Sequence, residues 1–112
     1  MRAFINGKEG ASLRIPKDSD VVLNGRMIND DGGQHDLSTA TVDLLLYSRP
    51  NRNVTVSLTA AAAVVTAADG TFTVTIADTA LTFGPGRYYA FARRTLSGVI
   101  TWAEKYTIID IF

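Results

Sequence analysis

The stretch Thr71-Phe72-Thr73-Val74-Thr75-Ile76 decides the fold, because hydrophobic side chains alternate strictly with threonines along it. Successive side chains of an extended strand point to opposite faces, so a period of two predicts one buried and one exposed face. Threonine suits the exposed face because its β-branched side chain fits an extended backbone. We therefore expect a half-buried antiparallel strand at residues 71–76.

The same alternation appears on both sides of this stretch. Val42, Leu44 and Leu46 share one face of residues 41–47, and residues 53–59 alternate valine and leucine with threonine and serine. Further strands are expected at residues 11–15, 19–28, 87–95 and 99–109. Asn24-Gly25 predicts a bulge or a turn within one of them, and Leu96-Ser97-Gly98 predicts a tight hairpin between the last two.

Turn-forming residues separate these segments. Glycine, proline, aspartate and asparagine gather at residues 30–33, 49–53, 69–70 and 84–86. Short strands at spacings of about ten residues, with turn signals between them, indicate a sandwich or a barrel. We predict an all-β, immunoglobulin-like antiparallel β-sandwich of six to eight strands over residues 18–112. Residues 1–17 form either an N-terminal arm or the first strand.

Two segments carry helix signals. The alanine run at residues 60–63 favours a helix by propensity, but Val64, Val65 and Thr66 favour an extended backbone. We expect a loop there that leads into a strand. A single helical turn is expected at residues 78–81, with Asp78 as its N-cap.

Composition limits the classes of protein that fit. The 112 residues suffice for one domain, and 46% hydrophobic with 20% charged residues is typical of globular chains. Lysine plus arginine and aspartate plus glutamate each number 11, so the net charge is zero and no nucleic-acid or membrane partner is expected. The absence of cysteine excludes disulfides and suits a reducing cytoplasm. No signal peptide or membrane-spanning run is apparent in the sequence.

No catalytic or metal-binding motif emerges from the sequence. His35 is the single histidine, and its acidic neighbours in residues 30–36 match no calcium or zinc spacing, so a solvated loop is expected. No serine-nucleophile elbow, carboxylate pair or phosphate-binding glycine loop is present. We therefore expect a protein that is not an enzyme and has no cofactor, metal or catalytic residues.

Aromatic residues near the C-terminus allow more than one reading. Arg93 and Arg94 follow Tyr88, Tyr89 and Phe91, but adjacent residues of a strand face opposite ways, so the arginines make no single patch for nucleic acid. We expect Tyr89 and Phe91 in the core, with one arginine on the surface.

Trp102 is expected to share a strand face with Ile100, Tyr106 and Ile108. It is either an exposed binding residue or part of the core, and a large aromatic on an apolar strand face favours the core.

Three stretches together resemble a known family. Asp36-Leu37-Ser38-Thr39-Ala40-Thr41-Val42, Ala68-Asp69-Gly70-Thr71-Phe72-Thr73-Val74 and Gly84-Pro85-Gly86-Arg87-Tyr88-Tyr89 are similar, in order and spacing, to immunoglobulin-like domains of phage tail and baseplate proteins. The N-terminal domain of the phage baseplate upper protein family is the named relative, and the resemblance covers residues 18–109. It implies no catalytic residues.

The resemblance implies a bacteriophage virion structural protein, made in the host cytoplasm and located in the virion. Such a protein would act as a capsid decoration or cement protein, or as a neck, tail or baseplate component, by docking onto major capsid or tail and baseplate subunits. A homo-oligomer is a further expectation. The alternative is a carbohydrate-binding or host-adhesion sandwich, in which Trp102, Tyr88 and Tyr89 stack on sugars.

Candidate protein contacts lie at the two ends of the chain, because free apolar ends can pair with a neighbour's exposed strand edge. They are Phe4, Ile5, Leu13, Ile15, Ile111 and Phe112. The other interpretation makes both ends the first and last strands of the same sandwich. We favour that interpretation for the C-terminus and an intermolecular contact for the N-terminal arm.

Overall fold

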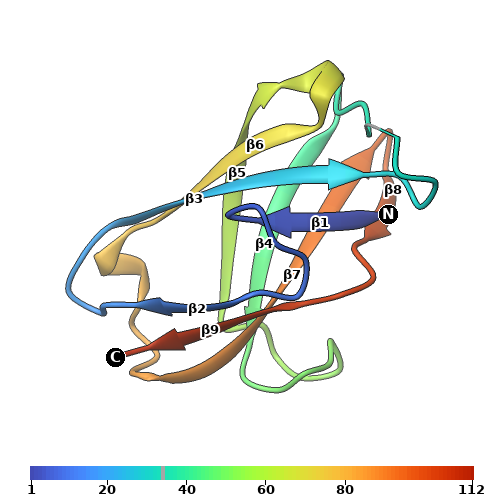
Figure 1. Ribbon diagram of the computed structural model, residues 1–112. Coiled ribbons are helices and arrows are strands. Elements are labelled where there is room, and N and C mark those ends of the chain that lie inside the picture. The colour runs from blue at the N-terminus through green and yellow to red at the C-terminus, as the bar shows by residue number, and fades with distance from the viewer. Residues whose placement is uncertain (34) are drawn as a thin grey trace.

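The computed structural model describes residues 1–33 and 35–112, and strands dominate it (Figure 1). The strands are β1 (Arg2–Ile5), β2 (Ser12–Ile15), β3 (Val21–Ile28), β4 (Thr41–Tyr47), β5 (Leu58–Thr66), β6 (Thr71–Ile76), β7 (Gly86–Leu96), β8 (Val99–Trp102) and β9 (Thr107–Ile111). Two single 3-10 turns, η1 (Ala67–Asp69) and η2 (Asp78–Ala80), complete the elements. Neither of these turns is long enough to cross a bilayer, and no other helix occurs in the described ranges.

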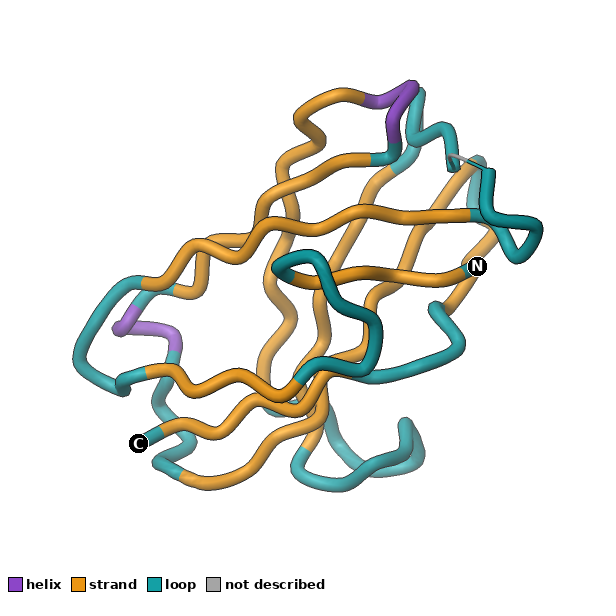
Figure 2. The backbone as a smooth tube through the Cα atoms, in the orientation of Figure 1, coloured by secondary structure: helices purple, strands orange, loops and turns teal. Residues whose placement is uncertain are grey.

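The strands form two layers that share β5 (Figure 2). Sheet A contains β1, β3, β6 and the second half of β5, whereas sheet B contains the first half of β5, then β4, β7, β9 and β2. β8 pairs with the end of β7. Every pairing is antiparallel except that of β2 with β9. The N-terminal segment contributes β1 to sheet A and β2 to sheet B. This division, together with the strand order, is that of an immunoglobulin-like sandwich, so the predicted all-β fold is confirmed.

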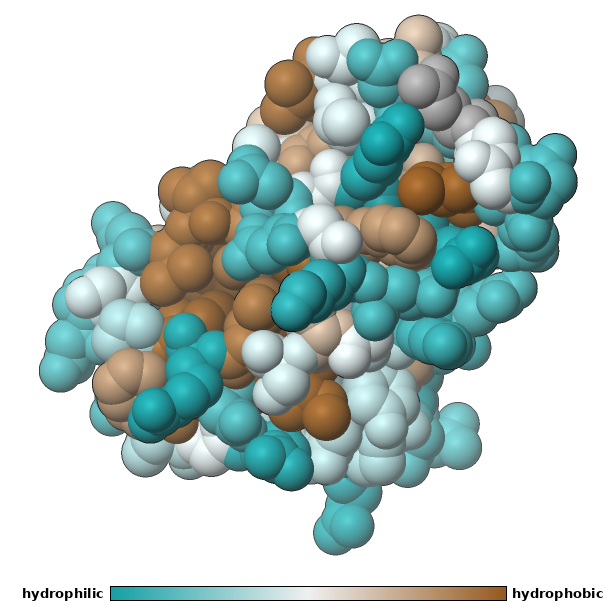
Figure 3. Space-filling view, viewed as in Figure 1, coloured by the Kyte–Doolittle hydropathy of each residue, from teal (hydrophilic) through white to brown (hydrophobic). Residues whose placement is uncertain are grey.

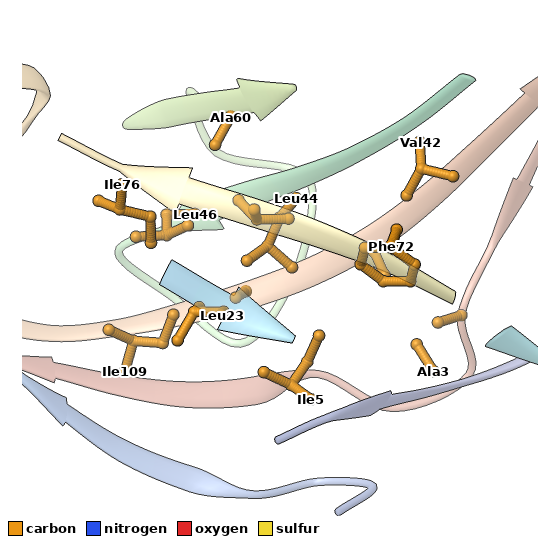
Figure 4. Packing of buried hydrophobic residues seen from close by; sticks show 14 of the residues in the cluster. Ala3, Ile5, Leu23, Val42, Leu44, Leu46, Ala60, Phe72, Ile76 and Ile109 are labelled. Atoms are coloured by element: carbon orange, nitrogen blue, oxygen red, sulfur yellow. The ribbon is translucent and has the colours of Figure 1, made fainter. Parts of the chain in front are cut away.

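The core lies between the sheets and follows the predicted alternation. Phe72, Val74 and Ile76 of β6 are at most 1% exposed, and Val42, Leu44 and Leu46 of β4 face them from the other layer. Figure 4 shows side chains of both layers pointing into the space between the ribbons, among them Phe72, Ile76, Val42, Leu44, Leu46, Leu23, Ile5 and Ile109. The period of two therefore identified the inward face of both central strands.

The segment around the alanine run differs from the expectation. Residues 53–57 are loop, so the strand predicted at 53–59 begins only at Leu58, and the alanines continue it as β5 instead of forming a loop. Small side chains permit this path: Ala60 enters the core, Asp43 pairs with Ala61 in sheet B, and Ala62 pairs with Val74 in sheet A. β5 thereby crosses from one layer to the other.

Three smaller expectations also change. Asn24 and Gly25 lie inside the continuous strand β3, so they form neither a bulge nor a turn. The strand predicted at 99–109 is divided into β8 and β9 by residues 103–106. The helical turn at 78–81 is confirmed as η2, but Ala77 occupies the N-cap position in place of Asp78.

The hairpin at Ser97-Gly98 is confirmed. Leu96 pairs with Val99, and both intervening residues have positive φ, 49° for Ser97 and 80° for Gly98. Positive φ at both central positions is the type I′ geometry that matches the twist of a two-residue hairpin.

Residues 1–17 are built into the sandwich and do not form a free arm. β1 pairs with β3 in sheet A, and β2 pairs with β9 in sheet B, so this segment supplies one strand to each layer. In the space-filling view, hydrophobic groups reach the surface in the region between β3 and β2 (Figure 3).

Candidate functional site: an aromatic face on sheet B

A second hydrophobic cluster covers the outer surface of sheet B, away from the sandwich core. Its buried members are Leu45 and Tyr47 of β4 and Phe91 of β7. Partly buried members pack around them: Val54, Tyr89, Trp102 and Tyr106. We call these seven residues the aromatic face. The β4–β5 loop supplies Val54 and the segment between β8 and β9 supplies Tyr106, so these two loops and the strands β4, β7 and β8 build this surface together.

The rings of the aromatic face hold one another edge-on. Tyr47 meets Phe91 at 5.6 Å between centroids and 83°, and Tyr89 meets Tyr106 at 5.1 Å and 88°. Trp102 lies 6.5 Å from Phe91 at 86°. Edge-to-face pairs bring the positive ring edge to the negative ring face and stabilise by about 0.5–1.5 kcal/mol each beyond the burial of area. The rings are therefore ordered before any partner arrives.

Two arginines stack on this face. The Arg52 guanidinium carbon lies 4.2 Å from the Trp102 ring centroid and 5.7 Å from that of Phe91, and Arg93 approaches Trp102 to 5.5 Å. Arg93 Nη2 also donates to Asp43 Oδ2 at 2.8 Å, which neutralises its charge. Arg52 makes no ion pair within residues 1–33 and 35–112. Arg52 is therefore the positive group that this face offers to a partner.

Ile100 extends the face along β8, and Ile108 extends it along β9. Ile100 pairs with Thr95, two positions from the Arg93–Trp102 pair, so Ile100 points to the same side as Trp102. Ile100 is 51% exposed. Ile108 pairs with Tyr89 and continues the same side on β9. The predicted sharing of one face by Ile100, Trp102 and Ile108 is thus confirmed.

The positions of Tyr89 and Trp102 differ from the expectation of a place in the core. Phe91 is buried as expected, at 8% exposed, but in the second cluster on the outer side of β7, and Tyr89 is only partly buried there. Tyr88, Ala90 and Ala92 take the inner side of β7. Trp102 is likewise half-buried on the outer surface and does not enter the core.

Tyr88 is the buried tyrosine, and its hydroxyl donates toward the carbonyl oxygens of Phe83 at 3.2 Å and Gly84 at 3.0 Å. This is the bond back to upstream backbone that marks a tyrosine corner. Tyr88 is only 8% exposed, so it offers no stacking surface for a sugar.

The two adjacent arginines point to opposite sides, as predicted. Arg93 belongs to the outer side, whereas Arg94 pairs with the buried Val42 and reaches His35 and Thr101 at the end of the sandwich. Arg94 Nη1 lies 2.6 Å from His35 Nε2, and Arg94 Nη2 donates to Thr101 Oγ1 at 3.1 Å.

His35 is held by this network and is not simply solvated. A guanidinium only donates, so Nε2 must accept, and the Nδ1 proton is then directed at Asn29 Oδ1. Partial burial, followed by the charge of Arg94, lowers the pKa of His35 below its ordinary value. The neutral imidazole of His35 therefore connects the loop that follows β3 with strand β7. The described residues contain no group of three acidic, histidine or cysteine side chains placed to hold a metal ion.

The candidate contacts at the chain ends divide into two groups. Ile5, Ile15 and Ile111 are at most 3% exposed and belong to the protein's own core, because β1, β2 and β9 are strands of the sandwich and turn these side chains inward. Phe4 and Leu13 are half-buried, and Arg2 and Arg14 stack on Phe4 and Phe112 respectively. Phe112 is 57% exposed. The structure does not gather these six residues into one surface.

The sequences of β4 and β7 contain a signal that identifies the aromatic face. β4 is apolar on its second side through Leu45 and Tyr47, and β7 through Tyr89 and Phe91. A strand with hydrophobic residues on both sides is covered on both sides. Arg52 has no such signal, because it lies in a loop.

Comparison with known proteins finds likeness in fold alone, at low sequence identity. No protein-family model matches the chain, and no curated protein matches it in sequence. Among solved structures, AggA, the major subunit of aggregative adherence fimbriae type I from Escherichia coli, superposes with a TM-score of 0.44 at 8% sequence identity. The alignment covers 98% of this chain and 93% of that one.

Proposed function

We propose that this protein is a non-catalytic docking module, and that the aromatic face with Ile100 is its contact surface. The observation that carries the proposal is the placement of Trp102, Tyr89 and Arg52 together on one rigid sheet surface beside an exposed isoleucine. Tryptophan, tyrosine and arginine are the residues enriched at the energetic centres of protein interfaces. The partner is a protein.

The chemistry of the face defines what the partner presents. A partner that packs on Ile100 and on the rings of Trp102 and Tyr89 presents an apolar surface. At the edge of that surface it presents a carboxylate, which pairs with the charge of Arg52. Edge-to-face packing fixes the rings beforehand, so little side-chain entropy is lost when the partner binds.

The resemblance of residues 18–109 to immunoglobulin-like domains of phage tail and baseplate proteins supports a specific setting. In that setting the protein is a bacteriophage virion component, attached to the capsid, neck, tail or baseplate through the aromatic face. A single sandwich with one apolar contact surface suits repeated attachment to a symmetric particle.

The test is incorporation into particles. Virus particles are purified by density gradient from bacteria that produce the chain, and the protein in them is quantified by immunoblot. We expect wild-type protein in the particles and a loss of about tenfold or more for Ile100→Asp, which places a charge in the contact. Val65→Asp is the matched control, because Val65 is 62% exposed on β5, away from the aromatic face, and should behave as wild type. Wild-type protein found only in the lysate would overturn the proposal.

A further inference from the structure

A hollow of about 360 Å³ adjoins one end of the aromatic face. Its walls come from the β1–β2 loop and from the segment that leads from β8 into β9. The lining residues are Gly10, Glu104, Lys105, Tyr106 and Ile108. Cavities of a few hundred Å³ are the size that small-molecule ligands occupy in proteins.

Tyr106 belongs to both the hollow and the aromatic face. Its ring packs edge-on against Tyr89 at 5.1 Å and lies tilted against Phe91 at 5.6 Å, so two neighbours fix its orientation. The same residue lines the hollow together with Ile108. The hollow therefore has an apolar wall whose main element is an aromatic ring held in place.

The polar lining of the hollow is balanced in charge, with one carboxylate from Glu104 and one ammonium group from Lys105. Lys105 Nζ lies 3.9 Å from Glu9 Oε1, and Arg2 Nε lies 3.2 Å from Glu9 Oε2. Glu104 adds a second carboxylate beside Lys105. Glu9 lies behind this lining and pairs with both Lys105 and Arg2, so the local charge is balanced and does not select an anion such as phosphate. These groups still supply both donors and acceptors for hydrogen bonds.

We propose that this hollow binds one neutral pyranose unit of a glycan, with a face of the sugar ring against Tyr106. A pyranose combines an apolar face of C–H groups, which packs on the negative face of an aromatic ring, with a rim of hydroxyls that donate and accept. The hollow pairs an aromatic wall with a rim of Glu104 and Lys105. This arrangement differs from a platform of Trp102, Tyr88 and Tyr89, because Tyr88 is buried. The hollow shares Tyr106 with the proposed docking surface but does not include Ile100.

The test is titration of the intact, isotope-labelled protein with methyl β-D-glucopyranoside, methyl β-D-galactopyranoside, methyl α-D-mannopyranoside and N-acetylglucosamine, followed by amide NMR shifts. We expect saturable shifts at Gly10, Lys105, Tyr106 and Ile108 with at least one sugar. Tyr106→Ala should weaken that binding roughly tenfold or more, whereas Tyr106→Phe, which keeps the ring, should change it less than about threefold.

A second variant guards against misfolding of Tyr106→Ala. Glu104 and Lys105 are exposed, so the double variant E104A/K105A should fold as wild type and weaken sugar binding roughly tenfold. The absence of saturable shifts with all four sugars would overturn the proposal, as would unchanged binding by the double variant. Shifts at the same residues with inorganic phosphate and with no sugar would overturn it too. Ile100→Asp leaves the hollow intact, so failure of docking and failure of sugar binding are distinguishable.

Discussion

Gly25 of β3 lies directly against the ring of Phe72 of β6, and the two residues are register partners across sheet A. A Cβ atom on residue 25 would come within 2.2 Å of two ring carbons of Phe72. The ring is 1% exposed, so it has no free space into which to move. A glycine within a strand here makes room for a large core side chain.

Gly25→Ala is therefore expected to destabilise the protein by about 1–3 kcal/mol, the usual cost of overpacking a core. Urea denaturation monitored by circular dichroism measures the change in the free energy of unfolding. The control is the double variant G25A/F72L, in which a smaller side chain relieves the clash. The double variant should lose less stability than the sum of its single variants. Strict additivity of the two losses would contradict the contact.

Tyr88→Phe should cost about 1–2 kcal/mol, because the carbonyl oxygens of Phe83 and Gly84 lose their partner in a partly buried corner. Thermal unfolding of the variant measures this loss. Tyr89→Phe is the matched control: Tyr89 is the next residue, its ring stays in the aromatic face, and no hydrogen bond of its hydroxyl is recorded among the described residues. Equal losses for the two variants would show that the corner bond adds nothing to stability.

Stability should fall as the pH falls below about 6.5, because of His35. Burial and Arg94 lower the pKa of His35 in the folded state, so the unfolded chain takes up a proton at a higher pH than the folded chain does. Above the unfolded pKa of 6.5 neither state is protonated and the full stability is present; below it, protonation favours the unfolded chain. Urea denaturation at pH 7, 6 and 5 checks this slope.

The control for the pH series is His35→Asn, which cannot titrate. Its free energy of unfolding should vary less between pH 7 and pH 5 than that of the wild type. Glu9 and Asp110 have lowered pKa values through their bonds to Arg2 and Arg87, so their protonation affects stability only at more acidic pH. An unchanged slope in His35→Asn would assign the pH dependence to other groups.

Arg52→Ala should expose the indole of Trp102, because the Arg52 guanidinium lies 4.2 Å from the ring centroid. Trp102 is the single tryptophan, so its fluorescence reports on this site alone. We expect stronger acrylamide quenching in the variant and a stability loss of about 0.5–1 kcal/mol. Arg49→Ala, in the same loop, is the matched control and should leave the quenching unchanged. No increase in Arg52→Ala would mean that the loop does not cover the ring in solution.

The sequence by itself determined the class of fold and the inner faces of the central strands. Hydrophobic residues alternate with other residues at 71–76 and around Val42, Leu44 and Leu46, so each strand turns its hydrophobic side inward. These hydrophobic side chains form the core. The turn at Ser97-Gly98 followed from local chemistry as well, because glycine adopts positive φ without strain.

Only the tertiary structure decided which strands are neighbours and what covers the outer surface. Periodicity is a local property, so it does not specify that β5 changes partner between Ala61 and Ala62 or that residues 1–17 serve both layers. The same limit applies to the aromatic face. Arg52 and Trp102 are far apart in the chain, and their contact forms only when the β4–β5 loop folds over sheet B. Long-range packing therefore placed the candidate site, while local pattern placed the core.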